Sequence, residues 1–155
     1  ATQWAESQAD LSVRENAMAD VALAMAGTDP IAAAEYVQRL APGDRKFNAI
    51  DSIAYRWSLK DLAASTTWAL ALSVEQGRDY AVFQVGAGRA SGDLAAALDW
   101  ASQQPAGVTR DNALGGVAYI MARTDPARAR SIAEGLAGGI GRTRALAAVA
   151  AKQAQ

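Results

Sequence analysis

Four acidic residues recur at a fixed interval and are the first side chains in this sequence whose spacing suggests chemistry. They stand 32 residues apart each time: Asp29, Asp61, Asp93 and Asp125. A row of carboxylates along one edge of a protein could act as a set of acidic ligands. Asp is also a favoured residue directly before a helix, because its carboxylate accepts a hydrogen bond from an unpaired backbone N–H. Proline follows two of them, at positions 30 and 126, and proline is well tolerated as the first helical residue. The pattern therefore favours helix caps.

A series of basic residues has the same interval. One stands fifteen residues before each aspartate, and a fifth continues the series: Arg14, Lys46, Arg78, Arg110 and Arg142. Such a row could bind an anionic partner. If each residue begins a helix that packs against the end of the preceding helix, its charge instead meets the unpaired carbonyls and the negative dipole end of that helix. We expect the second, structural role.

A glycine-rich segment, Gly86–Gly92, imitates a phosphate-binding turn. Tyr80–Val85 could be a strand, and a helix would begin at Leu94. However, the third glycine of a dinucleotide-binding fingerprint would fall at position 91, which is Ser91. The residues around the segment also keep the 32-residue register, which predicts a helix. Since glycine costs about 1 kcal/mol inside a helix, we expect this helix to be the weakest, and frayed or kinked.

The composition offers little for catalysis. The sequence has no His and no Cys, which removes the usual general base, the commonest metal ligand and any disulfide. No spacing singles out a pair of carboxylates. The net charge of −1 argues against a protein built to neutralise phosphates. No apolar run reaches the roughly 18 residues of a membrane span. We expect no enzyme, no cofactor, no metal site and no membrane span.

The interval itself predicts the fold. A large apolar side chain follows each aspartate by seven residues, and the first copy of this position is Trp4: Trp4, Tyr36, Trp68, Trp100 and Ile132. Two equivalent sets are all Ala (positions 17, 49, 81, 113, 145) and all β-branched (21, 53, 85, 117, 149). Small beside bulky residues let helices pack closely. A strict period of this length is typical of stacked helical repeats.

We therefore predict an all-α fold, a right-handed α-solenoid of antiparallel helix pairs with about nine helices, in a single domain over residues 1–155. The expected divisions are a half repeat at 1–12, four repeats at 13–44, 45–76, 77–108 and 109–140, and a last helix at 141–155. Residues 1–11 read as one helix. Ser12 and Glu15 have the spacing of a capping box, which would start the next helix near Val13.

The pattern resembles the Ala-rich αα-hairpin repeats of bacterial proteins, similar in style to tetratricopeptide and HEAT repeats. The likeness is carried by basic-x-x-Ala-apolar-x-x-Val-Ala followed by Asp-Pro-x-x-Ala-x-x-aromatic, seen from Arg110 to Ile132 and from Arg14 to Tyr36. It covers almost the whole chain, although proline is replaced at Leu62 and Leu94 and the aromatic residue is replaced at Ile132. The resemblance implies a binding or assembly scaffold and no substrate.

In a solenoid, invariant repeat positions build the core and varied ones face a partner. The most varied positions of the first helix of each repeat give five contact candidates for a peptide or protein partner: Asn48, Tyr55, Arg56, Asn112 and Tyr119. Tyr and Arg carry interface energy well, and the asparagines could hydrogen-bond an extended backbone. The alternative is a nucleotide- or nucleic-acid-binding domain that uses Gly86–Gly92 and the basic series.

The charge is uneven along the chain, with 8 Lys/Arg against 13 Asp/Glu in residues 1–109 and 7 against 3 in residues 110–155. The first and last segments also read as complementary halves of one repeat. We therefore expect head-to-tail self-assembly, or membership of a longer array. A start at Ala1 without Met fits an exported, a Met-trimmed or an excised chain, and the cytoplasm and the periplasm remain equally compatible.

Overall fold

The computed structural model describes residues 1–154, and over these residues the chain is all-α, as predicted, with ten helices and no strand. The helices are α1 (Thr2–Glu6), α2 (Leu11–Met25), α3 (Pro30–Val37), α4 (Asp44–Lys60), α5 (Leu62–Ala71), α6 (Arg78–Gly92), α7 (Leu94–Ser102), α8 (Val108–Met121), α9 (Pro126–Glu134) and α10 (Gly139–Gln153). About nine were expected. Gln155, the end of the predicted segment 141–155, lies outside the described residues. No described helix is long and apolar enough to cross a membrane.

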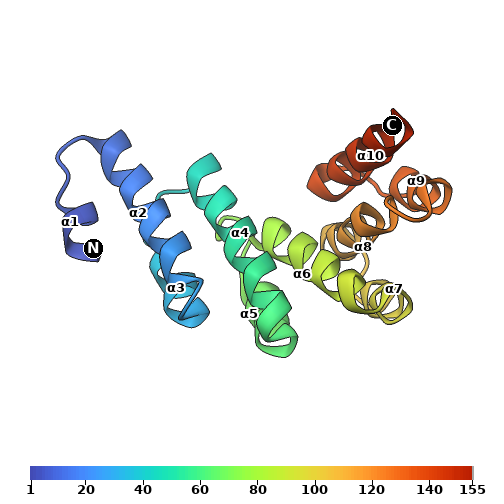
Figure 1. Ribbon diagram of the computed structural model, residues 1–155, viewed down its shortest axis with the longest axis horizontal. Coiled ribbons are helices and arrows are strands. Elements are labelled where there is room, and N and C mark those ends of the chain that lie inside the picture. Colours follow the sequence, from blue (N-terminus) through green and yellow to red (C-terminus); the bar gives the residue numbers. More distant parts are fainter. Residues whose placement is uncertain (155) are drawn as a thin grey trace.

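The helices follow one another in chain order from one end of the molecule to the other (Figure 1). The even-numbered helices pack on their even-numbered neighbours, whereas within residues 1–154 the backbones of the odd-numbered helices do not pack on one another. In addition, α10 reaches past α8 to α6. When two rows of helices curve together, the helices of the inner row lie closer to one another than those of the outer row. We therefore call α2, α4, α6, α8 and α10 the inner row and the odd-numbered helices the outer row.

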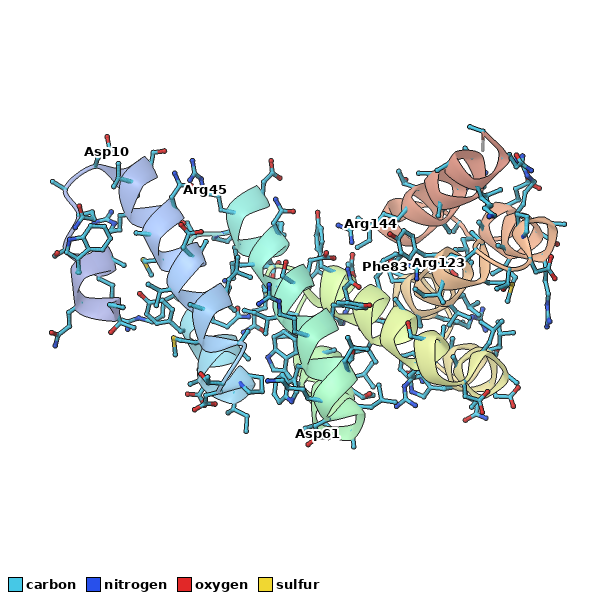
Figure 2. The ribbon with its side chains drawn as sticks, viewed as in Figure 1. Asp10, Arg45, Asp61, Phe83, Arg123 and Arg144 are labelled. Atoms are coloured by element: carbon cyan, nitrogen blue, oxygen red, sulfur yellow. The ribbon has the colours of Figure 1, made fainter. Side chains whose placement is uncertain are left out.

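The recurring aspartates cap the outer-row helices. Each carboxylate accepts a hydrogen bond from the backbone N–H three residues on, at 2.9–3.0 Å, at the start of α3, α5, α7 and α9. Asp61 stands at the outer end of the α4–α5 pair, where the chain reverses (Figure 2). The prediction of helix caps is confirmed at all four positions.

The first helices begin differently from the sequence prediction. Asp10, and not Ser12, caps α2, because its Oδ1 accepts from Val13 N at 2.9 Å. The helix therefore starts at Leu11, and α1 spans only Thr2–Glu6 instead of residues 1–11. Both residues are good N-caps by type, but Ser12 lies inside the first turn and its Oγ accepts from Arg45 Nη2 of α4 at 3.0 Å.

The equivalent Ala and β-branched positions form the core between inner-row helices. From α4 onward every one of them is buried, with at most 1% of its surface exposed: Ala49, Ile53, Ala81, Val85, Ala113, Val117, Ala145 and Val149. In α2, whose single inner-row neighbour is α4, Ala17 and Val21 are half-buried. The small-beside-bulky pattern therefore identified the helix–helix interface.

Glycines bring α6 and α8 into backbone contact. A Cβ added at Gly116 would lie 2.0 Å from Phe83 O, and one added at Gly86 would lie 2.4 Å from Ala113 O. Gly86 of α6 and Gly116 of α8 thus permit the close approach of the two helix backbones. The expectation of a frayed helix is wrong, since α6 is continuous from Arg78 to Gly92. The cost of glycine within the helix is offset by the packing that it allows between the two backbones.

Within residues 1–154, Lys46 is the one member of the basic series whose side chain is hydrogen-bonded to the end of the preceding helix. It lies near the start of α4 and is buried, and its Nζ donates to the carbonyl oxygen of Gln38, the residue that follows α3, at 3.2 Å. Burial lowers the pKa of Lys46 below its usual value, while the nearby Glu15 charge acts in the opposite direction. At this position the cation meets the end of the preceding helix, as expected from the dipole argument.

Candidate functional site

The inner row encloses a groove of about 540 Å³ at the C-terminal half of the molecule. Four inner-row helices contribute to it, although α4 and α10 are not packed on each other. We call it the concave groove. Its lining residues are Asp51, Ser52 and Tyr55 of α4, Phe83, Gln84 and Ala87 of α6, Tyr119 and Ile120 of α8 with Arg123 just after it, and Arg144, Ala147 and Ala148 of α10.

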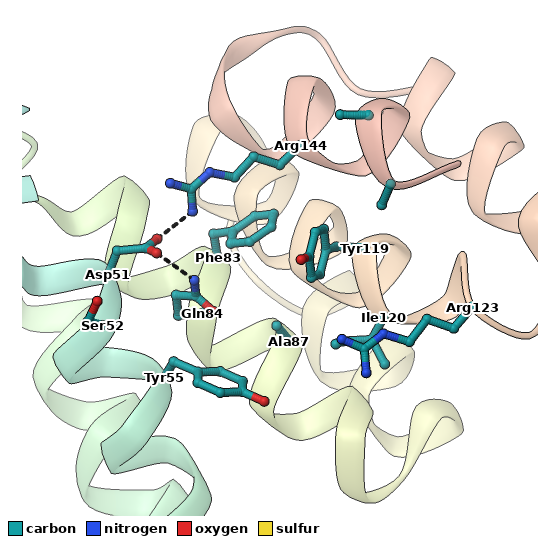
Figure 3. Close-up of a pocket in the computed structure, with 12 residues that line it drawn as sticks. Asp51, Ser52, Tyr55, Phe83, Gln84, Ala87, Tyr119, Ile120, Arg123 and Arg144 are labelled. Carbon is teal, nitrogen blue, oxygen red and sulfur yellow. Dashed lines mark hydrogen bonds and ion pairs between the residues drawn. The ribbon is translucent and has the colours of Figure 1, made fainter. Parts of the chain in front are cut away.

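An ion pair crosses one end of the concave groove. The guanidinium of Arg144 contacts the carboxylate of Asp51, 93 residues earlier in the chain (Figure 3). The second carboxylate oxygen accepts from Gln84 Nε2 at 2.8 Å. Asp51 is thereby held by two partners, one from α6 and one from α10. The pair joins two helices that share no other packing, so it fixes the width of the groove at this end.

Aromatic rings continue from this ion pair along the groove. The guanidinium of Arg144 lies 5.4 Å from the ring centre of Tyr80 and 5.1 Å from that of Phe83. The Phe83 ring in turn meets Tyr119 edge-on at 5.7 Å. Figure 3 shows Tyr55 on the opposite wall, with its ring toward the middle of the groove. A cation over aromatic faces and an edge-to-face pair both hold side chains in place before any ligand arrives.

The structure brings together two of the five predicted contact residues. Tyr55 and Tyr119 both line the concave groove. Asn48 and Arg56 are exposed on α4 but lie outside it. The prediction for Asn112 is wrong, because its side chain is buried and its Oδ1 accepts from Gly141 N of α10 at 3.1 Å. An asparagine committed to a neighbouring helix cannot bond an incoming backbone.

The sequence prediction missed Asp51, Arg144 and Arg123. Arg144 occupies the position equivalent to Asn48 and Asn112, one repeat further on. Arg144 lies in the predicted last helix, 141–155, beyond the four full repeats, and continues the same varied position. The position of Asp51 varies as well, since its equivalents one repeat apart are Ala19, Phe83, Gly115 and Ala147. Its pairing with Arg144, by contrast, depends on how far the inner row curves.

The Gly86–Gly92 segment is not a loop. It forms the second half of α6, so its backbone N–H groups belong to helical hydrogen bonds and do not form a phosphate-binding turn. Tyr80–Val85 is helical as well and not a strand. Within the described part of the chain no three His, Cys, Asp or Glu side chains come close enough to hold a metal ion.

Comparison with family models, with curated proteins and with solved structures gives no match. The functional argument therefore depends on the geometry of the concave groove.

Proposed function

We propose that this chain is a right-handed α-solenoid that acts as a non-enzymatic scaffold and binds an extended segment of a protein or peptide in its concave groove. The observation that carries the proposal is the lining of that groove by four successive inner-row helices. Successive repeats that each add side chains to one inner surface are the way solenoids recognise elongated ligands.

The side chains in the groove suit a binding role. Tyr55, Tyr119 and Arg123 are residue types that contribute strongly to protein interfaces. Two of the lining side chains are held in place: Phe83 supports Tyr119, and Asp51 with the aromatic rings holds Arg144. A surface already fixed in its bound geometry loses less conformational entropy when a partner binds.

The lining also lacks the parts of an acyl-transfer or hydrolytic site. Ser52 is its single alcohol of the Ser or Thr type, and the chain has no His or Cys to activate it. The one carboxylate in the lining, Asp51, is already engaged by Arg144 and Gln84. The same groups are sufficient to position a ligand.

The proposal is tested by selection from a display library of random linear peptides on the immobilised full chain. Selected peptides are then measured by fluorescence anisotropy against the wild type, Tyr119→Ala and Ile31→Ala. Ile31 is an exposed apolar residue of α3 in the outer row, away from the groove. We expect Tyr119→Ala to weaken binding by about tenfold or more, as for a central aromatic contact, and Ile31→Ala to leave it unchanged. No selected peptide, or equal binding by wild type and Tyr119→Ala, overturns the proposal.

A further inference from the structure

The charges of the concave groove are unequal. Its one acid, Asp51, is already paired with Arg144. Arg123 also lines the groove, and within residues 1–154 no carboxylate lies within ion-pair distance of its guanidinium. Once the internal pair is set aside, the groove carries an available positive charge at its α8–α10 end.

A second hollow extends the groove at that end. It lies between α8 and α10, has a volume of about 280 Å³, and shares Tyr119, Arg123 and Ala148 with the concave groove. Lys152 of α10 adds a second cation to it, again without a carboxylate partner in the described chain. The two hollows therefore adjoin, and both cations lie along the extension.

The floor of the extension is apolar and consists mainly of small side chains. Between Arg123 and Lys152 it is formed by Ala122, Ala148 and Ala151, with Tyr119 at one side. Alanines leave room above them that an apolar side chain can fill. If an extended peptide rests an aliphatic or aromatic side chain on these alanines, the residues on either side of it in the peptide lie beside the two cations.

We infer that the segment bound by the groove is acidic: it places an apolar side chain on the alanine floor and carboxylates against Arg123 and Lys152. This inference rests on the proposed function and adds the chemical class of the partner. Guanidinium and ammonium groups both bind carboxylates through charge-assisted hydrogen bonds. Because both cations stand at the rim of an open groove, they contribute mainly to selectivity and association rate, and their effect weakens with salt.

A peptide fits these features better than a nucleic acid. Nucleic acids are bound by rows of cations that follow the phosphate backbone, whereas the whole chain has a net charge of −1 and the extension offers two cations around an apolar floor. Binding of a single-stranded oligonucleotide is therefore a control in the test.

The experiment compares charge-reversed variants. Peptides selected on the full chain at low salt are sequenced, and one is resynthesised with Asn and Gln in place of its Asp and Glu. Both peptides are titrated against the wild type, the double variant Arg123→Glu/Lys152→Glu, and the matched double variant Arg128→Glu/Arg130→Glu. Arg128 and Arg130 lie on α9 outside both hollows, so this control changes the net charge equally. Circular dichroism checks that each variant keeps its helix content.

We expect the selected peptides to be enriched in Asp or Glu next to an apolar residue. The groove double variant should weaken the acidic peptide by about tenfold or more at low salt, as for reversed rim charges, and the α9 variant by far less. The neutral peptide should not distinguish the variants. Selected peptides without acidic enrichment, equal loss in both double variants, or tighter binding of the oligonucleotide than of the peptide overturns the inference. The proposed function survives the first two of these results, whereas an empty selection removes both.

Discussion

Replacing Gly116 by alanine tests the claim that α6 and α8 meet backbone to backbone. The new Cβ would lie 2.0 Å from Phe83 O and 2.9 Å from Ala87 N, and both are backbone atoms that cannot rotate away. The helices must therefore separate by about 1 Å to restore an ordinary contact. Overpacking of this kind costs about 1–3 kcal/mol, while alanine regains up to about 1 kcal/mol of helix propensity. We expect a net loss of about 1–2 kcal/mol, which lowers the thermal midpoint by about 2–4 °C for each kcal/mol.

Gly92→Ala is the matched control, because it makes the same chemical change in α6 where nothing lies within 4 Å of the added Cβ. There the loss of freedom in the unfolded chain should stabilise the protein by about 0.4–1 kcal/mol. Urea and thermal unfolding followed by circular dichroism and tryptophan fluorescence measure both variants. The reasoning is refuted if Gly116→Ala is as stable as the wild type, or if the two substitutions shift stability in the same direction.

Four further predictions concern charges. Asp51→Asn should lower the unfolding free energy by about 1 kcal/mol, as for an ion pair whose side chains are 20% and 30% exposed. A double-mutant cycle with Arg144→Gln should show a coupling energy that fades in high salt, and additive effects would contradict the pair. Asp93→Ala should cost about 0.5–2 kcal/mol through the lost cap of α7, while Asp93→Asn, which keeps an acceptor oxygen, should cost clearly less. Burial lowers the pKa of Lys46 in the folded protein, so just below the usual lysine pKa the unfolded chain binds more protons than the folded one. The unfolding free energy of the wild type should therefore rise relative to that of Lys46→Met as pH rises through this window. A difference in unfolding free energy that stays constant between pH 8 and 10.5 would contradict this. Finally, the unequal charge of the two chain segments predicts head-to-tail association, measured by light scattering as a mass that rises with protein concentration at low salt; a monomer at every concentration would exclude it.

Local signals in the sequence were sufficient for the helix ends and the core. The aspartate interval located four caps, and the equivalent Ala and β-branched positions located the inner-row interface, because both depend on residue type and period alone. Where two residues of similar type competed, as Asp10 and Ser12 did, the sequence could not choose. The outcome depends on which start lets Ser12 meet Arg45 of α4.

The site was less accessible from the sequence because it depends on curvature. Tyr55 and Tyr119 could be found as varied positions on the inner row, but Asn112 varies for another reason: it bonds the backbone of α10 beside Gly141. Likewise the glycines of α6 looked costly when only that helix was considered. Their stabilising contribution comes from close packing against the backbone of α8, which cannot be seen when α6 is considered alone.

The order of the helices also has a consequence for how the chain folds. Nearly all packing joins helices that are close in sequence, so their contacts form without closing long loops, and folding can start at the α6–α8 contact and spread to both sides. The ion pair between Asp51 and Arg144 spans 93 residues and requires the intervening helices to be in place. We therefore expect it to form last, so that the groove takes its final width after the rest of the protein has folded.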